Sequence, residues 1–320
     1  MLIHKEKENF KQLIEITADN MKLEKRIIEK DYWITYALKK LSENPVSEQI
    51  IFRGGTSLTK CYTDLKRFSE DIDLAVNINN DLTKSKITTI MKKAESVMCV
   101  DFEKTESDDN IKHGNYRNVE YKYTELFNIG SDPMQELNPR LKIETVTFLH
   151  PNPYEKKEVK SFIYNYLENE GLSDIIEKYQ LQPFTLNVLS IKRTVIDKII
   201  SLVRMSYEDS LKELCGKTRH LYDLHMTYDL VKDFYSDKKQ FKDIVKIVRD
   251  DEENSRFKDQ YPYKKKWSDS PLFNVIDYSR IKDAYENKFG AEFVYGELPS
   301  YNKILYTMQL IKEHLISIDE

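Results

Sequence analysis

Several features are scarce in this chain of 320 residues, and each scarcity excludes a class of protein. Cysteine occurs only at Cys61, Cys99 and Cys215, an odd number without the paired spacing of a zinc site. Neither a disulfide framework nor a structural zinc is therefore indicated. No apolar run approaches the roughly 18 residues of a membrane-spanning helix, and the charged start Met-Leu-Ile-His-Lys-Glu-Lys-Glu is unlike a signal peptide. We expect a protein of the reducing cytoplasm with no membrane partner.

Charge of one sign is not in excess either. Charged residues make up 32% of the chain and apolar residues 40%, but the formal net charge is only −4. No global positive field indicates a nucleic-acid partner, so a polyanion would have to meet a local basic patch. The chain is long enough for one large domain or two ordinary ones, with a substantial core.

Glycine is rare as well, yet two of the eight glycines, Gly54 and Gly55, are adjacent. They follow the apolar stretch 50–52 and precede Thr56 and Ser57, which is the pattern of a strand, a tight turn and the start of a helix. Adjacent glycines permit a positive φ and a close approach of the backbone to a bound group. Because the hydroxyls and free N–H groups at a helix start can bind anions, we expect this turn to hold phosphate.

A second predicted strand follows this turn and has two carboxylates. Asp71 and Asp73 are two residues apart, so both side chains lie on one face of the strand, with Ile72 and Leu74 on the other. Two such carboxylates can bind one divalent cation or a pair, and oxygen ligands favour Mg²⁺ (or Mn²⁺) over zinc. An isolated Asp-x-Asp is usually a surface strand with solvated aspartates. The glycine turn ahead of this one favours nucleotide chemistry.

The turn and the aspartate pair together carry a family resemblance. Gly-Gly-Thr-Ser at 54–57, followed by Asp-x-Asp at 71–73, resembles the signature of the DNA polymerase β-like nucleotidyltransferases. The AbiEii/AbiGii family of toxin nucleotidyltransferases is the more specific resemblance, through Phe-Arg-Gly-Gly-Thr-Ser-Leu at 52–58 and Arg-Phe-Ser-Glu-Asp-Ile-Asp-Leu at 67–74. It implies the toxin of a type IV toxin–antitoxin or phage-abortive system, with an NTP as substrate, a cognate antitoxin as partner and a tRNA acceptor end as target.

The resemblance also implies a third carboxylate on a neighbouring strand. The stretch 139–145 alternates, with Leu141 and Ile143 facing one way and Lys142 and Glu144 the other. Glu144 is the candidate third metal ligand, because it lies in mid-strand and its Leu-Lys-Ile-Glu string resembles the family at this place. A strand glutamate that only faces solvent is the alternative.

Two helical strings in the second half extend the resemblance. Residues 193–199 match an Arg-Thr-x-x-Glu-Lys string with Asp for Glu, which implies that Lys198 neutralises triphosphate charge; a solvated helix lysine is the alternative. Residues 219–224 resemble an Arg-His-x-x-Asp-Leu string, in which Asp223 would orient Lys198 or help position an acceptor hydroxyl. An ordinary ion pair between Arg219 and Asp223, four residues apart on a helix, is the alternative.

Periodicity predicts helices over 5–42 and 81–100, and a long helical region after a last strand at 184–189. A β-hairpin is predicted from 100–106 and 118–123, and a loop over 151–160. The fold class is thus predicted to be α/β (α+β), with a nucleotidyltransferase-type mixed sheet and N-terminal helices in domain 1–188. A helical domain, 189–320, follows.

Two smaller strings admit two interpretations each. Lys30-Asp31-Tyr32-Trp33 resembles a family string, and Lys30 or Asp31 could face an active cleft; we favour the alternative that Tyr32 and Trp33 pack their helix onto the sheet. The basic and aromatic segment 256–267 has a composition that suits single-stranded RNA ends, and a solvated loop is its alternative.

The function predicted from these residues is metal-dependent, in-line transfer of an NMP from an NTP to an acceptor hydroxyl. Asp71 and Asp73 would bind the metal and the triphosphate, and Glu144 would help to activate the hydroxyl. Gly55 and Ser57 would hold the β,γ-phosphates. An acceptor that is a small molecule or a protein, or a non-catalytic nucleotide-binding module, are the alternatives. The intact Asp-x-Asp argues against the last.

Overall fold

The computed structural model describes residues 1–62, 65–78, 82–106, 110–127, 139–255 and 257–318. The chain divides into two compact units, which are treated separately below. Unit 1 consists of Met1–Tyr62, Phe68–Thr147 and Tyr154–Val188. Unit 2 consists of Thr63–Arg67, Phe148–Pro153 and Leu189–Glu320. Two short segments from the N-terminal half of the sequence therefore belong to the second unit.

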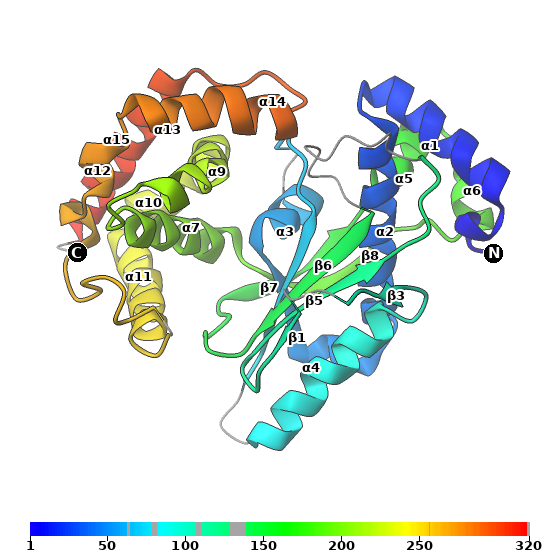
Figure 1. Ribbon diagram of the computed structural model, residues 1–320, viewed down its shortest axis with the longest axis horizontal. Coiled ribbons are helices and arrows are strands. Elements are labelled where there is room, and N and C mark those ends of the chain that lie inside the picture. The colour runs from blue at the N-terminus through cyan, green and yellow to red at the C-terminus, as the bar shows by residue number, and fades with distance from the viewer. Residues whose placement is uncertain (63–64, 79–81, 107–109, 128–138, 256, 319–320) are drawn as a thin grey trace. The chain divides into compact units, whose positions relative to one another are not determined.

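Unit 1 is built on one mixed sheet of eight described strands (Figure 1). The strands are β1 (Ile50–Arg53), β2 (Asp71–Val76), β3 (Glu103–Lys104), β4 (Ile111–Lys112), β5 (Tyr116–Lys122), β6 (Arg140–Val146), β7 (Tyr154–Val159) and β8 (Phe184–Leu189). Their order is β3-β5-β6-β2-β1-β8-β7, and β4 pairs with β5 beside this path. β1 runs antiparallel to β2 and parallel to β8, whereas β2 runs parallel to β6. The predicted α/β fold with a mixed sheet is confirmed.

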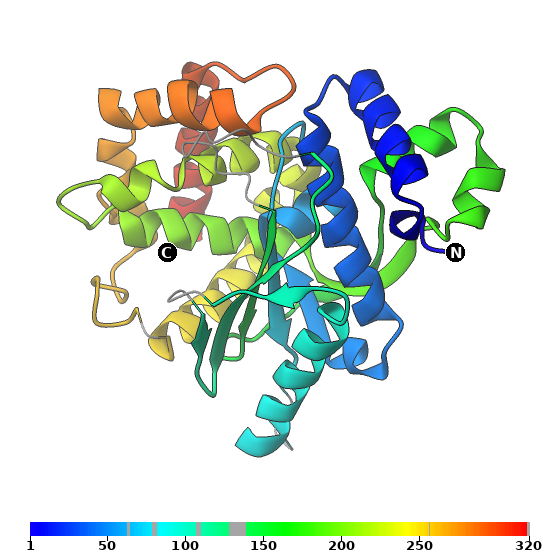
Figure 2. The ribbon, with the colours of Figure 1, turned by 45° about the vertical axis from the view of Figure 1, so that its right-hand side comes forward.

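The helices of unit 1 precede, separate and follow its strands along the sequence. They are η1 (Ile3–Lys5), α1 (Lys7–Met21), α2 (Lys25–Ser42), η2 (Pro45–Gln49), α3 (Gly54–Cys61), α4 (Lys84–Met98), α5 (Phe162–Asn169) and α6 (Ser173–Lys178). α2 ends ahead of Pro45, which cannot continue it, and the side chain of Asn44 accepts a hydrogen bond from Val46 N at 3.1 Å. Figure 2 shows that α1 lies beside α5, although the two are far apart in the sequence.

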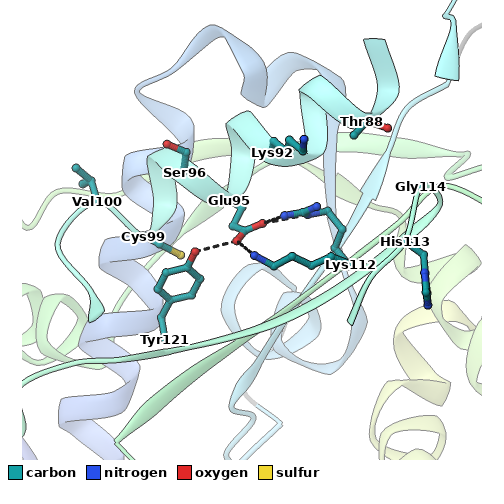
Figure 3. Close-up of a pocket in the computed structure, with 11 residues that line it drawn as sticks. Thr88, Lys92, Glu95, Ser96, Cys99, Val100, Lys112, His113, Gly114 and Tyr121 are labelled. Atoms are coloured by element: carbon teal, nitrogen blue, oxygen red, sulfur yellow. Dashed lines mark hydrogen bonds and ion pairs between the residues drawn. The ribbon is translucent and has the colours of Figure 1, made fainter. Parts of the chain in front are cut away.

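One face of the sheet is covered by α2 and α4. At the outer end of the sheet, Glu95 of α4 accepts hydrogen bonds from Arg117 and Tyr121 of β5 (Figure 3). The rest of the covered face is mainly apolar and includes Ile72 of β2 and Ile143 of β6. Because side chains alternate along a strand, the aspartates of β2 lie on the opposite face.

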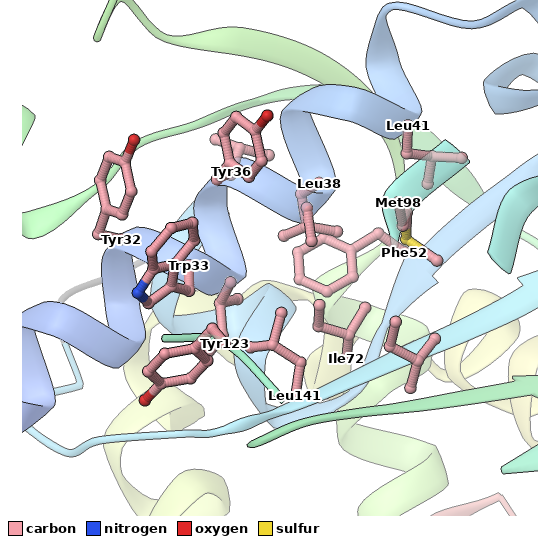
Figure 4. Packing of buried hydrophobic residues seen from close by; sticks show 14 of the residues in the cluster. Tyr32, Trp33, Tyr36, Leu38, Leu41, Phe52, Ile72, Met98, Tyr123 and Leu141 are labelled. Carbon is pink, nitrogen blue, oxygen red and sulfur yellow. The ribbon is translucent and has the colours of Figure 1, made fainter. Parts of the chain in front are cut away.

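The aromatic side chains of α2 form the centre of this core. Tyr32 and Trp33 are buried, with ring centroids 5.2 Å apart, and the Trp33 ring stacks on Tyr123 at 5.6 Å (Figure 4). Phe52 of β1 packs in the same cluster. The prediction of packing onto the sheet is confirmed for Trp33, whereas the ring of Tyr32 packs mainly against Phe10 of α1 and His4 of η1.

Unit 2 is helical in the residues that the structure describes. Its helices are α7 (Ile191–Met205), α8 (Lys212–Cys215), α9 (Thr218–Tyr228), η3 (Asp229–Val231), α10 (Lys232–Ser236), α11 (Lys238–Glu253), η4 (Trp267–Asp269), α12 (Leu272–Val275), α13 (Ser279–Asp283), the π-helical turn η5 (Ala284–Phe289), α14 (Gly290–Phe293) and α15 (Tyr301–Ser317). α7 begins at a serine cap, in which Ser190 Oγ accepts from Arg193 N at 3.2 Å. α9 packs against both α7 and α15. None of the helices in the described part of the chain has the length and apolarity that a bilayer crossing requires.

Two local predictions in unit 1 need correction. The expected loop over 151–160 contains β7, an edge strand whose residues are mostly charged and exposed. Edge strands often have such residues, which hide the alternation that identifies a strand in sequence. The expected hairpin exists as β3 and β5, but β4 forms inside its predicted connection, of which residues 107–109 lie outside the described residues.

Candidate active site

Three carboxylates of unit 1 lie on the face of the sheet opposite to the apolar face that α2 and α4 cover. β2 and β6 are parallel neighbours, and their register pairs Asp73 with Glu144 and Asp71 with Lys142. All three carboxylate residues are half-buried. Asp71, Asp73 and Glu144 therefore occupy adjacent positions on two strands, as the sequence pattern predicts for three ligands of one centre.

The chemistry of these three side chains fits a hard divalent cation, which prefers carboxylate oxygens. Their side-chain positions do not form a closed site, because no three His, Cys, Asp or Glu side chains of the described residues gather as a metal-binding group. Tyr116 of β5 donates a hydrogen bond from its hydroxyl to Glu144 Oε2 at 3.0 Å and so restrains that carboxylate. The fit to a metal thus rests on donor chemistry and strand register, and the ligand roles of the three residues stay predictions.

The glycine turn touches the aspartate pair directly. Gly54 is the first residue of α3 and has a φ of +80°. A Cβ at this position would lie 2.1 Å from Oδ2 of Asp73, closer than any side chain can approach. The expected positive φ is present at Gly54, and at Gly55 it is not. Gly54 is thus required by both its backbone conformation and its contact with Asp73.

The two hydroxyls after the glycines point into the protein. Thr56 Oγ1 donates to the main-chain carbonyl of Asp71 and lies 2.9 Å from Ser69 Oγ. Ser57 Oγ donates to Gly54 O at 2.9 Å, and both residues are buried. These contacts fix the start of α3 to the start of β2. Phosphate contacts of Gly55 and Ser57 stay predictions, to which the turn would contribute chiefly backbone N–H groups.

Consecutive charged residues of α2 hold the segments around this site. Lys30 is buried and forms an ion pair with Glu70, the residue before Asp71. Asp31 is also buried, and its carboxylate accepts from Lys60 Nζ of α3 at 2.6 Å and from Phe162 N at 2.8 Å. Lys30 and Asp31 therefore position the flanks of β2 and α3, a role that the packing interpretation of this string did not include.

Glu29, the third of these charged residues, contacts the chain after β5. Its Oε1 accepts from Leu126 N at 2.8 Å, and the N–H of Phe127 is a second donor. Burial raises the pKa of Glu29 from 4.5 to about 7, and the two N–H groups partly oppose that increase. This carboxyl group therefore titrates close to neutral pH.

Unit 2 has its own charged centre, a buried triad of Arg67, Lys198 and Asp223. Asp223 Oδ2 lies 2.7 Å from Lys198 Nζ and 2.8 Å from Arg67 Nη2, and Arg67 Nε donates to the other oxygen, Oδ1. All three side chains are at most 5% exposed. The predicted contact between Asp223 and Lys198 is observed. The alternative, an ordinary helix ion pair between Arg219 and Asp223, is not observed within the described residues.

The protonation of this triad follows from two cations sharing one anion. Burial lowers the pKa of Lys198, and Arg67 acts in the same direction, while Asp223 opposes both. Burial alone would raise the pKa of Asp223, but Arg67 and Lys198 together lower it. Asp223 is therefore held as a carboxylate, and Lys198 is the cation that loses its proton more easily.

Comparison with known proteins identifies the family. The family described as "Nucleotidyl transferase AbiEii toxin, Type IV TA system" matches residues 36–302. The chain belongs to the AbiEii family. The match spans the glycine turn, the three carboxylates and the Lys198–Asp223 pair. No curated protein matches the chain in sequence.

Solved structures with a similar chain path share little sequence with this AbiEii protein. MenT4, the nucleotidyltransferase toxin Rv2826c from Mycobacterium tuberculosis H37Rv, has 16% identity and a TM-score of 0.48, over 95% of this chain and 98% of its own. A protein from H. pylori described as a candidate nucleotidyltransferase has 14% identity and a TM-score of 0.42, over 93% of this chain and 100% of its own. JHP933 from Helicobacter pylori has 16% identity and a TM-score of 0.38, with the same coverage. We draw no functional conclusion from likenesses this distant.

Arg67 is the triad member that sequence reasoning missed. Its partner Asp223 lies 156 residues away, so no local pattern relates the two. The available signal was the Arg-x-Ser-Glu string at 67–70, which forms part of the AbiEii resemblance.

In the basic and aromatic segment 256–267 of this AbiEii protein, aromatic rings are buried while lysines are exposed. Tyr261 and Trp267 are buried, and the Phe257 ring lies 3.9 Å from the guanidinium carbon of Arg204. The three lysines between them are exposed: Lys264, Lys265 and Lys266. Arg256, the first residue of the segment, lies outside the described residues. The two buried rings cannot stack on bases, so any contact of this segment with RNA would depend mainly on the three lysines; RNA binding by the segment stays a prediction.

Proposed function

We propose that this AbiEii-family protein transfers an NMP from an NTP to a hydroxyl at the 3′ end of a tRNA, in the cytoplasm and with the help of Mg²⁺ or Mn²⁺. It would thereby act as a toxin, opposed by a cognate antitoxin. Family membership supports the nucleotidyltransferase chemistry and the toxin class. The observation that carries the proposal is the placement of Asp71, Asp73 and Glu144 side by side on one sheet face, next to the turn at Gly54.

Asp71, Asp73 and Glu144 are proposed to hold the divalent cation, which would neutralise phosphate charge and align the reacting oxygens. The N–H groups at the start of α3 would bind the triphosphate, because a helix start attracts anions. Glu144, held by Tyr116, would accept the proton of the attacking hydroxyl, directly or through water.

Lys198 is proposed to offset the negative charge that develops on the leaving pyrophosphate. Asp223 would keep its ammonium group in a fixed orientation, since the two are in direct contact. An alternative role of Asp223, to help position the acceptor hydroxyl, would lower the apparent affinity for the acceptor when Asp223 is changed.

The test is incubation of the purified protein with each α-labelled NTP, Mg²⁺ and total tRNA, followed by gel analysis and mass spectrometry of the RNA. We expect label in tRNA with at least one NTP, none in the presence of EDTA, and none with an Asp73→Asn variant. Label in a small hydroxyl compound or a protein, and none in RNA at low salt, would replace the tRNA acceptor. Unchanged NTP under every condition would refute the transfer itself.

A further inference from the structure

A second polar site lies on the other face of the sheet of unit 1. A pocket of about 790 Å³ is formed between α4 and the β4–β5 hairpin (Figure 3). Arg117 and Tyr121 line it, and they alternate along β5 with Tyr116 and Asn118. Asn118 is paired in register with Glu144, so the pocket and the three carboxylates face opposite sides of one sheet.

Cations outnumber anions in this pocket. Lys92, Lys112 and Arg117 line it together with a single carboxylate, that of Glu95. Glu95 is buried and accepts from Arg117 Nε at 3.0 Å, Lys112 Nζ at 3.3 Å and Tyr121 Oη at 2.8 Å, so one anion is shared by two of the cations. Lys92 has no ion-pair or hydrogen-bond partner within the described residues.

The neighbourhood of Lys112 shows the same excess of positive charge. Lys104 of β3 has Lys112 as a neighbour, and the proximity of this second cation lowers the pKa of Lys104. Burial would raise the pKa of Glu95, but its hydrogen bonds to Arg117 and Tyr121, together with the neighbouring cations, outweigh burial and lower it, which favours the carboxylate form. An additional anion from outside would relieve the repulsion between the cations.

We propose that this pocket binds a phosphate group, presented by a free nucleotide or by an RNA strand. A phosphate has at least one negative charge and several acceptor oxygens, which match Lys92, the outer N–H groups of Lys112 and the hydroxyl of Ser96. The buried Arg117–Glu95 pair gives the pocket a fixed floor, and Gly114, whose Cβ position has open space around it, leaves its rim free. None of its lining residues is one of the three carboxylates, which lie on the opposite face of the sheet.

The test reads the pocket directly by lysine footprinting. The full-length protein is acetylated with and without inorganic phosphate, ATP or a short 5′-phosphorylated oligoribonucleotide, in EDTA, and modified lysines are quantified by mass spectrometry. We expect Lys92 and Lys112 to be protected, while the exposed Lys7 and Lys11 of α1 are not. Protection by inorganic phosphate and by ATP would show that the pocket binds a free phosphate group. Protection by the oligoribonucleotide, with none by phosphate or ATP, would show that it binds a phosphate of an RNA strand.

A pair of double variants provides the matched comparison. Lys92→Ala/Lys112→Ala is expected to weaken binding of the protecting ligand by about tenfold or more, since two charge-assisted contacts are removed. Lys7→Ala/Lys11→Ala removes the same charge from a distant helix of the same unit and is expected to change nothing. Glu95 keeps Arg117 in the first variant, so its melting temperature serves to confirm folding. No protection by any probe, equal binding by both variants, or equal protection by polyglutamate at matched charge would overturn the proposal.

Discussion

A Cβ atom on Gly54 would lie 2.1 Å from Oδ2 of Asp73. The two halves of the nucleotidyltransferase motif, the glycine turn and the aspartate pair, are therefore in direct contact. Thr56 adds a second connection, because its hydroxyl donates to the carbonyl of Asp71. The conformation of the turn and the position of the proposed metal ligands depend on each other.

Gly54→Ala is the sharpest test of this contact. Alanine would have to adopt a φ of +80° and displace the Asp73 carboxylate, so we expect loss of transfer activity and a destabilisation of roughly 1–2 kcal/mol. Gly171→Ala is the matched control, because Gly171 has a φ of +70° with nothing within 4 Å of its Cβ position. It should lose somewhat less stability, because only the φ is strained, and keep full activity. Equal activity of both variants would show that the Asp73 position does not matter.

The carboxylates themselves are tested by Asp71→Asn and Asp73→Asn. Both side chains are half-buried on a strand face, so the amides should leave the fold intact. Loss of a metal ligand is expected to lower the transfer rate on the order of a thousandfold. Glu120→Gln, at a neighbouring strand carboxylate that pairs with Arg140, is the control and should retain activity. Near-normal turnover of both Asp variants with unchanged Mg²⁺ dependence would refute the metal assignment.

Local patterns explain which parts of this site could be predicted from sequence. The alternation in β2 and in β6 placed Asp71, Asp73 and Glu144 on one face, because a strand period of two is a property of the backbone alone. The partner of Asp223 could not be found in this way, since Arg67 meets it only through tertiary folding. β7 was missed for a different reason: a charged edge strand has no apolar alternation to detect.

Substitution of Lys198 tests whether this residue has a catalytic or a structural role. In Lys198→Met, Asp223 keeps two hydrogen bonds to Arg67, so the melting temperature should stay close to that of the wild type. The rate of transfer should fall about 100-fold, as when a preorganised donor is removed. Asp223→Asn, in contrast, leaves two buried cations without an anion and should cost about 3–5 kcal/mol of stability. Early unfolding of Lys198→Met with normal specific activity would make Lys198 structural.

Glu29 predicts a pH dependence of stability. Burial raises the pKa of Glu29 from 4.5 to about 7 in the folded protein. The folded state therefore binds this proton more tightly than the unfolded chain does. The resulting stabilisation is complete below about pH 4.5 and is lost as the pH rises through about 7. Glu29→Gln should therefore match the wild type at about pH 4 and exceed it at about pH 8, by on the order of 2–3 kcal/mol.

Urea denaturation of wild type and Glu29→Gln at the two pH values measures this difference. Glu43→Gln, at an exposed glutamate of the same region, is the control and should show no such divergence. If the wild type is instead the more stable protein at the higher pH, the carboxylate contacts with the N–H groups of Leu126 and Phe127 outweigh the burial of charge.

The exposed lysines of unit 2 test the RNA acceptor. Lys264, Lys265 and Lys266 are adjacent and exposed, and in a protein of net charge −4 such a patch must supply the attraction to phosphate. Each lysine that neutralises a phosphate of a single strand contributes about 0.7 to the slope of log K against log salt. Replacing all three by alanine should thus reduce the slope for tRNA binding by up to about 2, without changing NTP binding.

The matched control replaces three exposed lysines of α11, Lys238, Lys239 and Lys242, by alanine. It removes the same charge elsewhere in unit 2 and should leave the slope unchanged. Equal slopes for the two triple variants would exclude this segment as the RNA contact, and a tRNA affinity that does not depend on salt would argue for an acceptor other than RNA.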